Sequence, residues 1–396
     1  TEVDRLLLKR DSLSSKHREL FIDNELWELY TRHGGTGLNA FTSNLMTAYF
    51  VTLPSNKLEL FFWLESDRMQ NAVLRAFDSE HQVVREERRL RYDDSPTGRY
   101  FETLQAVFWE GHPYRSPTIG WPCDIASLTR QQAQEHYDRF YKPSNAILVL
   151  VGDFDLAFAQ ELVARYFAPI PAGEAVAPVT FQEPAQVGPK RFVQYKDDAT
   201  PRLDLLFHTP GLGDRDLYAL DVVEAVLNGR TGRLYRELVE KQQVATRVSA
   251  GNGVQKGESS FELSLHIRPG VSLERAEEAL WGELRKLQSE KISEREFEKV
   301  KNQLLAGNWR RLRDMDYLAT QIAFFEMNGD WSLVTRFAEE VARTTPEEVM
   351  DVAQRYFRYD RSTTGAMLPD SLSPDSQWMR SLQSEEKALF EKGSEK

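Results

Sequence analysis

The sequence contains one cysteine in 396 residues, which excludes an internal disulfide and any multi-cysteine metal site. It also lacks any apolar run near the roughly 18 residues that a membrane-spanning helix needs. Acidic residues outnumber basic ones by 61 to 50, and the net charge of −11 argues against a general nucleic-acid-binding protein. None of the seven histidines is followed by another at the spacing of H-E-x-x-H or H-x-x-E-H. The sequence therefore contains no complete histidine-based zinc motif.

The length and the hydrophobic content of 41% are sufficient for two or three domains with sizeable cores. The first residue is Thr1 and not methionine, so we expect the chain to be a processed or truncated product. A signal peptide would lie outside such a chain, and the cellular compartment therefore stays open.

A stretch rich in proline, from 169 to 189, predicts a semi-rigid linker because proline interrupts helices and central strands. It separates a predicted N-terminal domain (1–168) from a C-terminal domain (190–369). The last residues, 370–396, are polar and predict a tail with a surface helix from Trp378 to Phe390.

The two halves carry matching landmarks. Thr129 begins a predicted helix that is followed by a β-rich run from Ala146 to Asp153, and Thr345, 216 residues later, begins a helix that is followed by a weaker run, Ser362–Leu368. In the same way, a predicted strand ends before Pro54 and another ends near Pro269, and an amphipathic helix follows each. The spacing predicts a duplicated α+β unit. We expect two homologous domains, each an antiparallel sheet covered by helices.

A predicted helix from Phe77 to Leu90 places Glu80, Val84 and Glu87 on one face, because seven residues drift by only about 20° around a helix. Phe77, Val84 and Leu90 predict that this face is buried. Carboxylates among apolar positions need a cation or several hydrogen bonds. One interpretation is that the two glutamates pair with arginines or lie in water at the edge of the stripe. The other is a metal-ligating carboxylate with a supporting acid.

Two histidines lie near these segments. His81 is expected to point away from the face of the glutamates and to be exposed. His112 is expected to be a loop histidine that makes a structural hydrogen bond.

Gly34–Ser43 is a glycine-rich segment that opens a strand, and Ser43 and Asn44 could turn the chain into a second strand. No Gly-Lys-Ser/Thr follows, so the segment is not a phosphate loop. Two interpretations stay open. The segment is either a hairpin loosened by glycine or an exposed edge strand that offers backbone groups to an extended peptide.

At these segments the chain resembles the pitrilysin/insulinase family of zinc metallopeptidases, or inverzincins, and most closely its bacterial branch similar to mitochondrial processing peptidase subunits. The segments that carry the resemblance are Gly35–Ser43, the Glu80-x6-Glu87 helix, Gly111–Tyr114, Val151–Asp153 and Gly229–Leu238. The resemblance implies a two-domain α+β fold whose first domain is N-terminally incomplete, and a zinc-dependent endopeptidase that cleaves extended peptides.

The resemblance also implies roles for individual residues. Glu87 matches the family's downstream zinc ligand, and Glu80 matches its supporting acidic residue. The strand that pairs with substrate peptide matches Asn39, Ala40, Phe41 and Thr42. The H-x-x-E-H motif, with two ligands and the general base, would lie upstream of Thr1, so zinc binding by this chain alone is expected to be weak or absent.

The chain departs from the family pattern in its second half. An Arg-x6-Tyr pair that holds substrate in the family is replaced by Val239 and Thr246. The resemblance therefore implies a homo- or heterodimer in which a related subunit supplies that pair. Shifting the two glutamates by 216 residues leads to Glu296 and Gln303, so the proposed ligand has no counterpart there.

Three functional hypotheses follow from the sequence. The first is a zinc metalloendopeptidase subunit, located in the bacterial periplasm or cytoplasm, that lacks its H-x-x-E-H segment and has no membrane span or nucleic-acid partner. The alternative is a non-catalytic partner or core subunit of the same family that binds peptide or a catalytic partner. A weaker third hypothesis is a peptide-binding scaffold unrelated to proteolysis.

Overall fold

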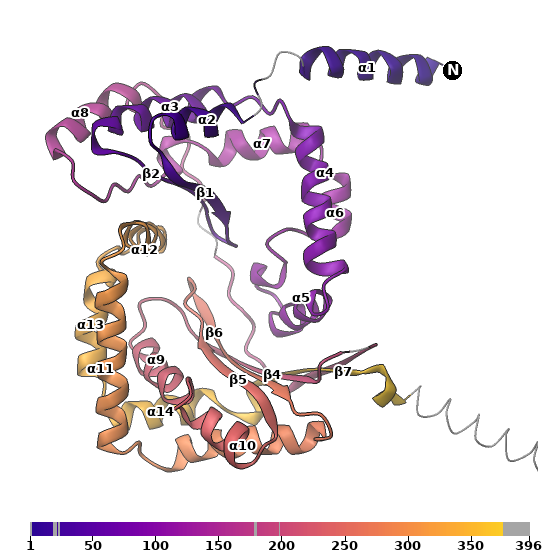
Figure 1. Cartoon of the computed structure of the whole chain (residues 1–396), viewed down its shortest axis with the longest axis vertical. Helices are drawn as coiled ribbons and strands as arrows, with labels where there is room; N and C mark the ends of the chain where they lie inside the picture. Colours follow the sequence, from indigo (N-terminus) through magenta and orange to yellow (C-terminus); the bar gives the residue numbers. More distant parts are fainter. Residues whose placement is uncertain (1, 19–21, 23, 178–179, 198, 375–396) are drawn as a thin grey trace, which may run out of the picture. The chain divides into compact units, whose positions relative to one another are not determined.

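A computed structural model describes residues 2–18, 22, 24–177, 180–197 and 199–374 of the chain (Figure 1). The predicted helix from Trp378 to Phe390 lies outside these residues. Internal contacts divide the chain into two compact units. Unit 1 comprises Thr1–Leu74, Glu135–Ala146 and Gly152–Val176, and unit 2 comprises Arg75–Gln134, Ile147–Val151 and Ala177–Lys396. These units follow contacts within the chain, and the domain boundaries given above stay a prediction.

Unit 1 consists of a two-stranded antiparallel sheet and helices (Figure 1). Its elements are α1 (Glu2–Arg18), α2 (Glu25–Arg32), β1 (Thr36–Thr42), β2 (Thr47–Thr52), η1 (Ser55–Lys57), α3 (Leu58–Asn71), the last residues of α7 (Arg130–Phe140), η4 (Pro143–Asn145) and α8 (Leu156–Tyr166). Helix α3 packs against α8, and the Phe62 ring meets that of Phe167 at a centroid distance of 6.0 Å.

The predicted hairpin is confirmed. Strands β1 and β2 pair in antiparallel fashion, with Thr42 opposite Thr47. The Ser43 hydroxyl accepts hydrogen bonds from the backbone N–H groups of Leu45 and Met46, which closes the turn. Gly34 precedes the hairpin with a φ of 87°, a backbone conformation that glycine adopts without steric cost.

Unit 2 contains the remaining helices and a five-stranded sheet. Its first elements are α4 (Phe77–Arg88), the π-helical turn η2 (Arg89–Asp93), α5 (Gly98–Phe108), η3 (Pro113–Arg115), α6 (Pro122–Ser127) and the start of α7. The later elements are β3 (Lys190–Lys196), β4 (Arg202–Pro210), α9 (Asp216–Leu227), η5 (Tyr235–Lys241), β5 (Ala245–Asn252), β6 (Glu258–Ile267), α10 (Leu273–Ser289), α11 (Glu294–Arg311), α12 (Met315–Met327), α13 (Leu333–Arg343), α14 (Pro346–Tyr356), η6 (Tyr359–Arg361), β7 (Ser362–Pro369) and η7 (Asp370–Leu372).

The strand order of this sheet is β3-β7-β4-β6-β5. Neighbouring strands are antiparallel except for β3 and β7, which are parallel. The sheet is therefore mixed, although antiparallel pairing dominates as the sequence predicts. Strands β3 and β5 form its two edges.

Strand β4 is buried on both of its faces, and successive side chains alternate between them. One face carries Leu203, Leu205 and Phe207, which join the hydrophobic core beneath α9, α10 and α14. The opposite face carries Asp204 and His208. Both faces of the sheet are thus covered at β4.

Helix α5 and the residues after it cover the second face of the sheet. The Tyr100 hydroxyl donates a hydrogen bond of 2.6 Å to Asp204, which also accepts from the Arg202 guanidinium. The Phe108 ring stacks on His208 at a centroid distance of 4.0 Å. These contacts explain why residues 98–114 belong to unit 2 although they precede the predicted linker.

Most of the paired landmarks of the two halves are present. Thr129 and Gln132 cap α7, and Thr345 forms a capping box with Glu348 at the start of α14. Both hairpins are followed by a proline and a helix, α3 in one half and α10 in the other. These features support a duplicated α+β unit.

One predicted strand is wrong. Residues 146–153 form no strand among the described residues, whereas the matching run in the second half is β7. Strand β7 lies between β3 and β4 and forms ladders with both, but no described strand pairs with 146–153. A sequence of β-forming residues becomes a strand only where partners satisfy its backbone groups.

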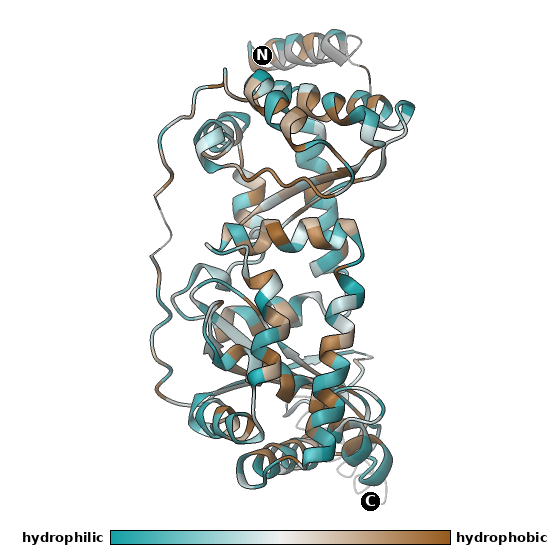
Figure 2. Cartoon of the chain, turned by 90° about the vertical axis from the view of Figure 1, so that its left-hand side faces the viewer, coloured by the Kyte–Doolittle hydropathy of each residue, from teal (hydrophilic) through white to brown (hydrophobic). Residues whose placement is uncertain are grey.

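Among the described residues, no helix combines the length and the apolar character that crossing a bilayer requires. Figure 2 shows hydrophilic and hydrophobic residues side by side along the helices, as expected where one face of a helix packs on a core and the other meets water.

Candidate functional site

Helix α4 carries the two glutamates that the sequence singles out. Acidic residues occupy its first turn and basic residues its last turn, which complements the helix dipole. The Glu80 side chain is exposed and makes no ion pair with any described residue. The Glu87 side chain is 40% exposed, and its Oε1 lies 2.7 Å from Nη2 of Arg91. Arg91 is itself 69% exposed. Both carboxylates are therefore accessible at the surface of unit 2.

The prediction of which face of this helix is buried is wrong. Leu90 is 62% exposed, and Phe77 and Val84 are only partly buried. The fully buried side chain is Arg88, which donates to the backbone carbonyl of Gly120 at 2.7 Å and to Glu102 at 2.5 Å. A cation with a buried carboxylate and a carbonyl as partners can occupy the inner face, so an apolar stripe alone does not identify that face.

The expectation that His81 is exposed is also wrong. Its Nε2 lies 2.5 Å from the backbone oxygen of Ile125, and its ring stacks on Phe77 at a centroid distance of 5.6 Å. The residue joins α4 to α6 and is partly buried. A partner 44 residues away in the chain explains why helical periodicity did not reveal this role.

His112 behaves as the sequence predicts. It precedes η3, and its Nδ1 accepts a hydrogen bond from the backbone N–H of Tyr114 at 3.2 Å. The preceding backbone is held by Glu183, whose carboxylate accepts from the N–H groups of Glu110, Gly111 and His112 at 2.5, 3.0 and 2.8 Å. Burial alone would raise the pKa of Glu183, but these three hydrogen bonds lower it.

The described residues do not by themselves form a zinc site. No group of three or more histidine, cysteine, aspartate or glutamate side chains in the described part of the chain is arranged to hold a metal ion. Glu87 offers one carboxylate, whereas zinc in proteins takes three or four protein ligands. Among the described residues, its one ion pair joins two partly exposed groups, and pairs of this kind contribute little to stability.

Strand β1 is the other segment that the sequence predicts as functional. The backbone N–H of Ser43 donates to Met46, so alternate residues of β1 face β2 and Ala40 and Thr42 face outward. The outward N–H of Ala40 donates to the side chain of Asn39 at 2.8 Å. The sheet order places no strand beyond β1 among the described residues, so Thr42 presents an open backbone edge.

The second half of the chain carries Glu296 and Gln303 at the positions that match Glu80 and Glu87. Glu296 on α11 forms a two-point ion pair with Arg233, at 3.0 Å to Nε and 2.7 Å to Nη2. Gln303 is exposed on the same helix. Val239 packs against the core of unit 2, and Thr246 is exposed on β5. The outer acid is therefore locked in a salt bridge.

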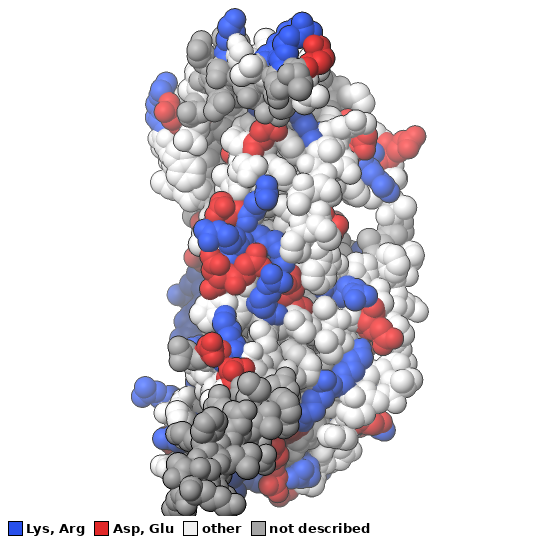
Figure 3. Space-filling view, turned by 90° about the vertical axis from the view of Figure 1, so that its right-hand side faces the viewer, with Lys and Arg blue, Asp and Glu red and all other residues white. Residues whose placement is uncertain are grey.

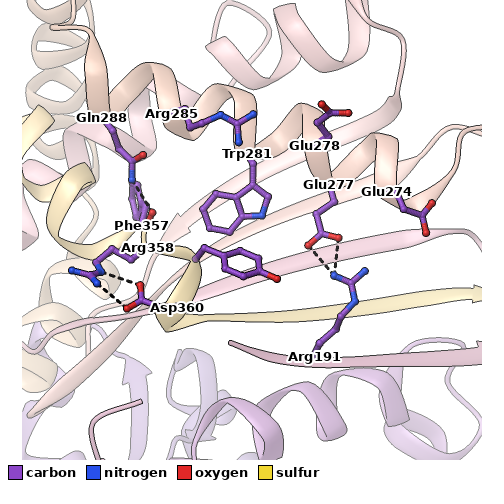
Figure 4. Close-up of a pocket in the computed structure, with 11 residues that line it drawn as sticks. Arg191, Glu274, Glu277, Glu278, Trp281, Arg285, Gln288, Phe357, Arg358 and Asp360 are labelled. Atoms are coloured by element: carbon purple, nitrogen blue, oxygen red, sulfur yellow. Dashed lines mark hydrogen bonds and ion pairs between the residues drawn. The ribbon is translucent and has the colours of Figure 1, made fainter. Parts of the chain in front are cut away.

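A groove of roughly 750 Å³ lies between α10 and the turn after α14 (Figure 4). The Trp281 and Tyr359 rings both line it, with their centroids 5.8 Å apart and their planes tilted by 59°. Arg191 pairs with Glu277, and Arg358 pairs with Asp360. Neither Glu80, Glu87 nor the β1 residues line this groove.

Charged side chains of both signs surround α4. Arg89 pairs with Glu86 at 2.9 Å and with Asp94 at 2.5 Å. Figure 3 shows one face of the molecule on which basic and acidic side chains lie interspersed. A net charge of −11 thus does not produce an acidic surface of one sign on this face.

Known proteins resemble this chain in sequence and in structure. Residues 127–304 match the family model described as "Peptidase M16 inactive domain". The zinc protease PqqE of Helicobacter pylori is 28% identical over 351 residues, which cover 87% of this chain and 79% of that protein. The mitochondrial-processing peptidase subunit beta of Lentinula edodes is 24% identical over 60% of this chain and 52% of its own length.

The crystal structure of a protease from Helicobacter pylori superimposes with a TM-score of 0.82 at 28% identity. The match covers 87% of this chain and 85% of that one. Fold, family model and sequence relatives thus agree on one class of protein, a two-part α+β peptidase fold. These matches support the resemblance of the chain to the pitrilysin/insulinase family of peptidases, M16.

Proposed function

We propose that the protein is a subunit of a zinc-dependent metalloendopeptidase that hydrolyses peptide bonds in extended peptides. Glu87 supplies one zinc ligand, and Glu80 is the supporting acid on the same helix. The remaining ligands and the general base come from an H-x-x-E-H segment that is not within these 396 residues, either in the same protein or in a partner.

One observation carries this proposal. Glu87 is accessible on α4, and the Arg91 side chain that pairs with it is mostly exposed. Exposed ion pairs contribute only about 0–1 kcal/mol, so releasing Glu87 to a metal costs little. A buried carboxylate with several partners, such as Glu102, could not serve in this way.

The substrate in this proposal is an extended peptide that adds to β1. The backbone of Ala40 and Thr42 faces outward, and the strand has seven residues. Backbone pairing gives affinity for any extended peptide, while neighbouring side chains such as Asn39 and Phe41 give preference. A related subunit in a homo- or heterodimer would supply the Arg/Tyr pair that Val239 and Thr246 replace.

The experiment that tests this function is cleavage of an internally quenched extended peptide by the protein together with its H-x-x-E-H segment or partner. The expected result is cleavage that stops when zinc is chelated, returns when zinc is added, and is lost in Glu87→Gln. The matched control is Glu86→Gln, which changes the neighbouring exposed glutamate.

A second candidate function is a non-catalytic partner or core subunit of the same family. The description of the matching model as an inactive domain favours it. In this case the assembled protein binds peptide, and cleavage by its partner proceeds unchanged in Glu87→Gln. That single variant therefore separates the two functions.

A further inference from the structure

Strand β5 forms one edge of the sheet in unit 2, and such an edge can accept another strand. The backbone N–H of Gly253 donates to Ser260 on β6, so the odd-numbered residues just before it face β6. Val248, Ala250 and Asn252 consequently present their backbone groups outward. An extended peptide that joined this sheet at β5 would have to bind these groups.

Side chains of α9 and its C-cap already bind two of the three residues. The Asn228 amide accepts a hydrogen bond from the Ala250 N–H at 2.8 Å and donates one to the Ala250 carbonyl at 2.8 Å. This two-point bond reproduces what a neighbouring strand would form. Oε2 of Glu224 accepts from the Asn252 N–H at 2.9 Å.

Glu224 lies on α9 and Asn228 is the C-cap of this helix, which packs against β5. Glu224 and Asn228 are four residues apart, and Asp221 is three residues before Glu224. Asp221 accepts a hydrogen bond of 2.8 Å from the Asn252 side chain. Burial raises the pKa of Glu224 and raises that of Asp221 to about 7, which is consistent with carboxylates withdrawn from water.

Among the described residues, only the outward groups of Val248 and the outward carbonyl of Asn252 have no recorded partner, and the capped Ala250 lies between them. These separated groups offer too few hydrogen bonds for strand addition, which relies on several consecutive pairs. The edge of β1 differs, because Thr42 is open and Ala40 is occupied only by the side chain of its neighbour Asn39.

We propose that Asn228 and Glu224 close the β5 edge against extended peptides and against the strands of other chains, whereas the proposed function uses the edge of β1. The choice of β1 as the peptide-binding edge rests on the proposed function, whereas the closure of β5 does not. Asn228 and Glu224 are in this view specificity-determining residues, which exclude a second peptide from the duplicated half of the molecule.

The test compares wild type, Asn228→Ala and the double variant Asn228→Ala/Glu224→Ala by hydrogen exchange of residues 245–252. Loss of the cap is expected to accelerate exchange of the Ala250 amide at least about tenfold. Asn228→Asp is the conservative control, because it keeps the acceptor for that amide and should preserve its protection. It also shows whether a change at position 228 alone disturbs the fold.

The same variants are then titrated with a fluorescent (Thr-Val)₄ octapeptide, and their mass is measured by light scattering. The proposal expects the double variant to bind one more equivalent of peptide than wild type, or to self-associate where wild type does not. It is overturned if Ala250 stays protected in Asn228→Ala, or if exchange accelerates without added peptide binding or self-association. Failure of wild type to bind peptide would instead count against β1 as a substrate strand.

Discussion

Arg88 and Glu102 form an ion pair at 2.5 Å in which both side chains are almost completely buried. The pair joins α4 to α5, and Arg88 also donates to the carbonyl of Gly120. Because Glu87 immediately precedes Arg88, this anchor fixes the rotation of α4 and keeps the Glu87 carboxylate at the surface. The rotation of α4 about its axis thus determines both that Arg88 is buried and that Glu87 is exposed.

Replacing Glu102 should strongly destabilise unit 2. Glu102→Leu leaves the Arg88 guanidinium buried without its carboxylate, and such a loss typically costs about 3–5 kcal/mol. Urea denaturation followed by circular dichroism measures the difference in the free energy of unfolding. The matched control is Glu86→Leu, whose exposed pair with Arg89 should contribute less than about 1 kcal/mol. Equal losses in the two variants would contradict the anchoring role.

The β1 edge can be tested by removing one outward N–H. Thr42→Pro deletes a donor that faces away from β2, so binding of an extended peptide should weaken about five- to tenfold, the value of one net hydrogen bond. Thr47→Pro is the matched control, because Thr47 lies opposite Thr42 and its N–H faces the other edge of the hairpin. Fluorescence anisotropy with a labelled peptide measures both. If the two prolines weaken binding equally, β1 is not the binding edge.

His208 predicts a pH dependence of stability. Burial lowers its pKa to about 4, whereas an unfolded chain titrates near the ordinary value of about 6.5. The unfolded state therefore binds a proton first, and stability is lost as the pH falls from about 6.5 towards 4. The loss between pH 7 and pH 4.5 should be about 2 kcal/mol for this residue.

Urea denaturation of wild type and His208→Gln at the two pH values measures this effect as a difference between proteins. Asp221 acts in the opposite direction, because its raised pKa of about 7 favours the folded state at low pH. The wild-type slope alone therefore mixes both groups, and the comparison isolates His208. His136→Gln replaces an exposed histidine and should keep the wild-type slope. An unchanged slope in His208→Gln would refute the assignment.

Local patterns predicted much of the fold. The hairpin of β1 and β2 and the caps at Thr129 and Thr345 depend on residues close in sequence, and all three are present. The constant offset between the two halves could also be predicted, because the capping residues and prolines that mark their elements repeat in the sequence. The predicted sheet direction is right for most strand pairs, although the parallel pairing of β3 with β7 joins distant segments that no local pattern reveals.

The errors share one cause, which is a partner far along the chain. Arg88 can be buried because its guanidinium donates hydrogen bonds to Glu102 and to the Gly120 carbonyl. His81 is partly buried because its ring contacts the backbone oxygen of Ile125. Hydrophobic periodicity predicted the buried and the exposed face of helix α4 without knowledge of these distant partners. The run 146–153 has strand composition but no described partner strand. At the candidate site, the spacing of Glu80 and Glu87 was visible, whereas their exposure depended on this helix register.

The zinc content of the assembled protein shows whether Glu87 is a metal ligand. The protein is purified with its H-x-x-E-H segment or partner, and zinc is measured by mass spectrometry in wild type, Glu87→Gln and the control Glu86→Gln. We expect about one zinc per assembled site in wild type and in the control, and loss of most of this zinc in Glu87→Gln, because one of the few protein ligands is removed. Equal zinc content in wild type and Glu87→Gln would contradict the assignment of Glu87 as a ligand.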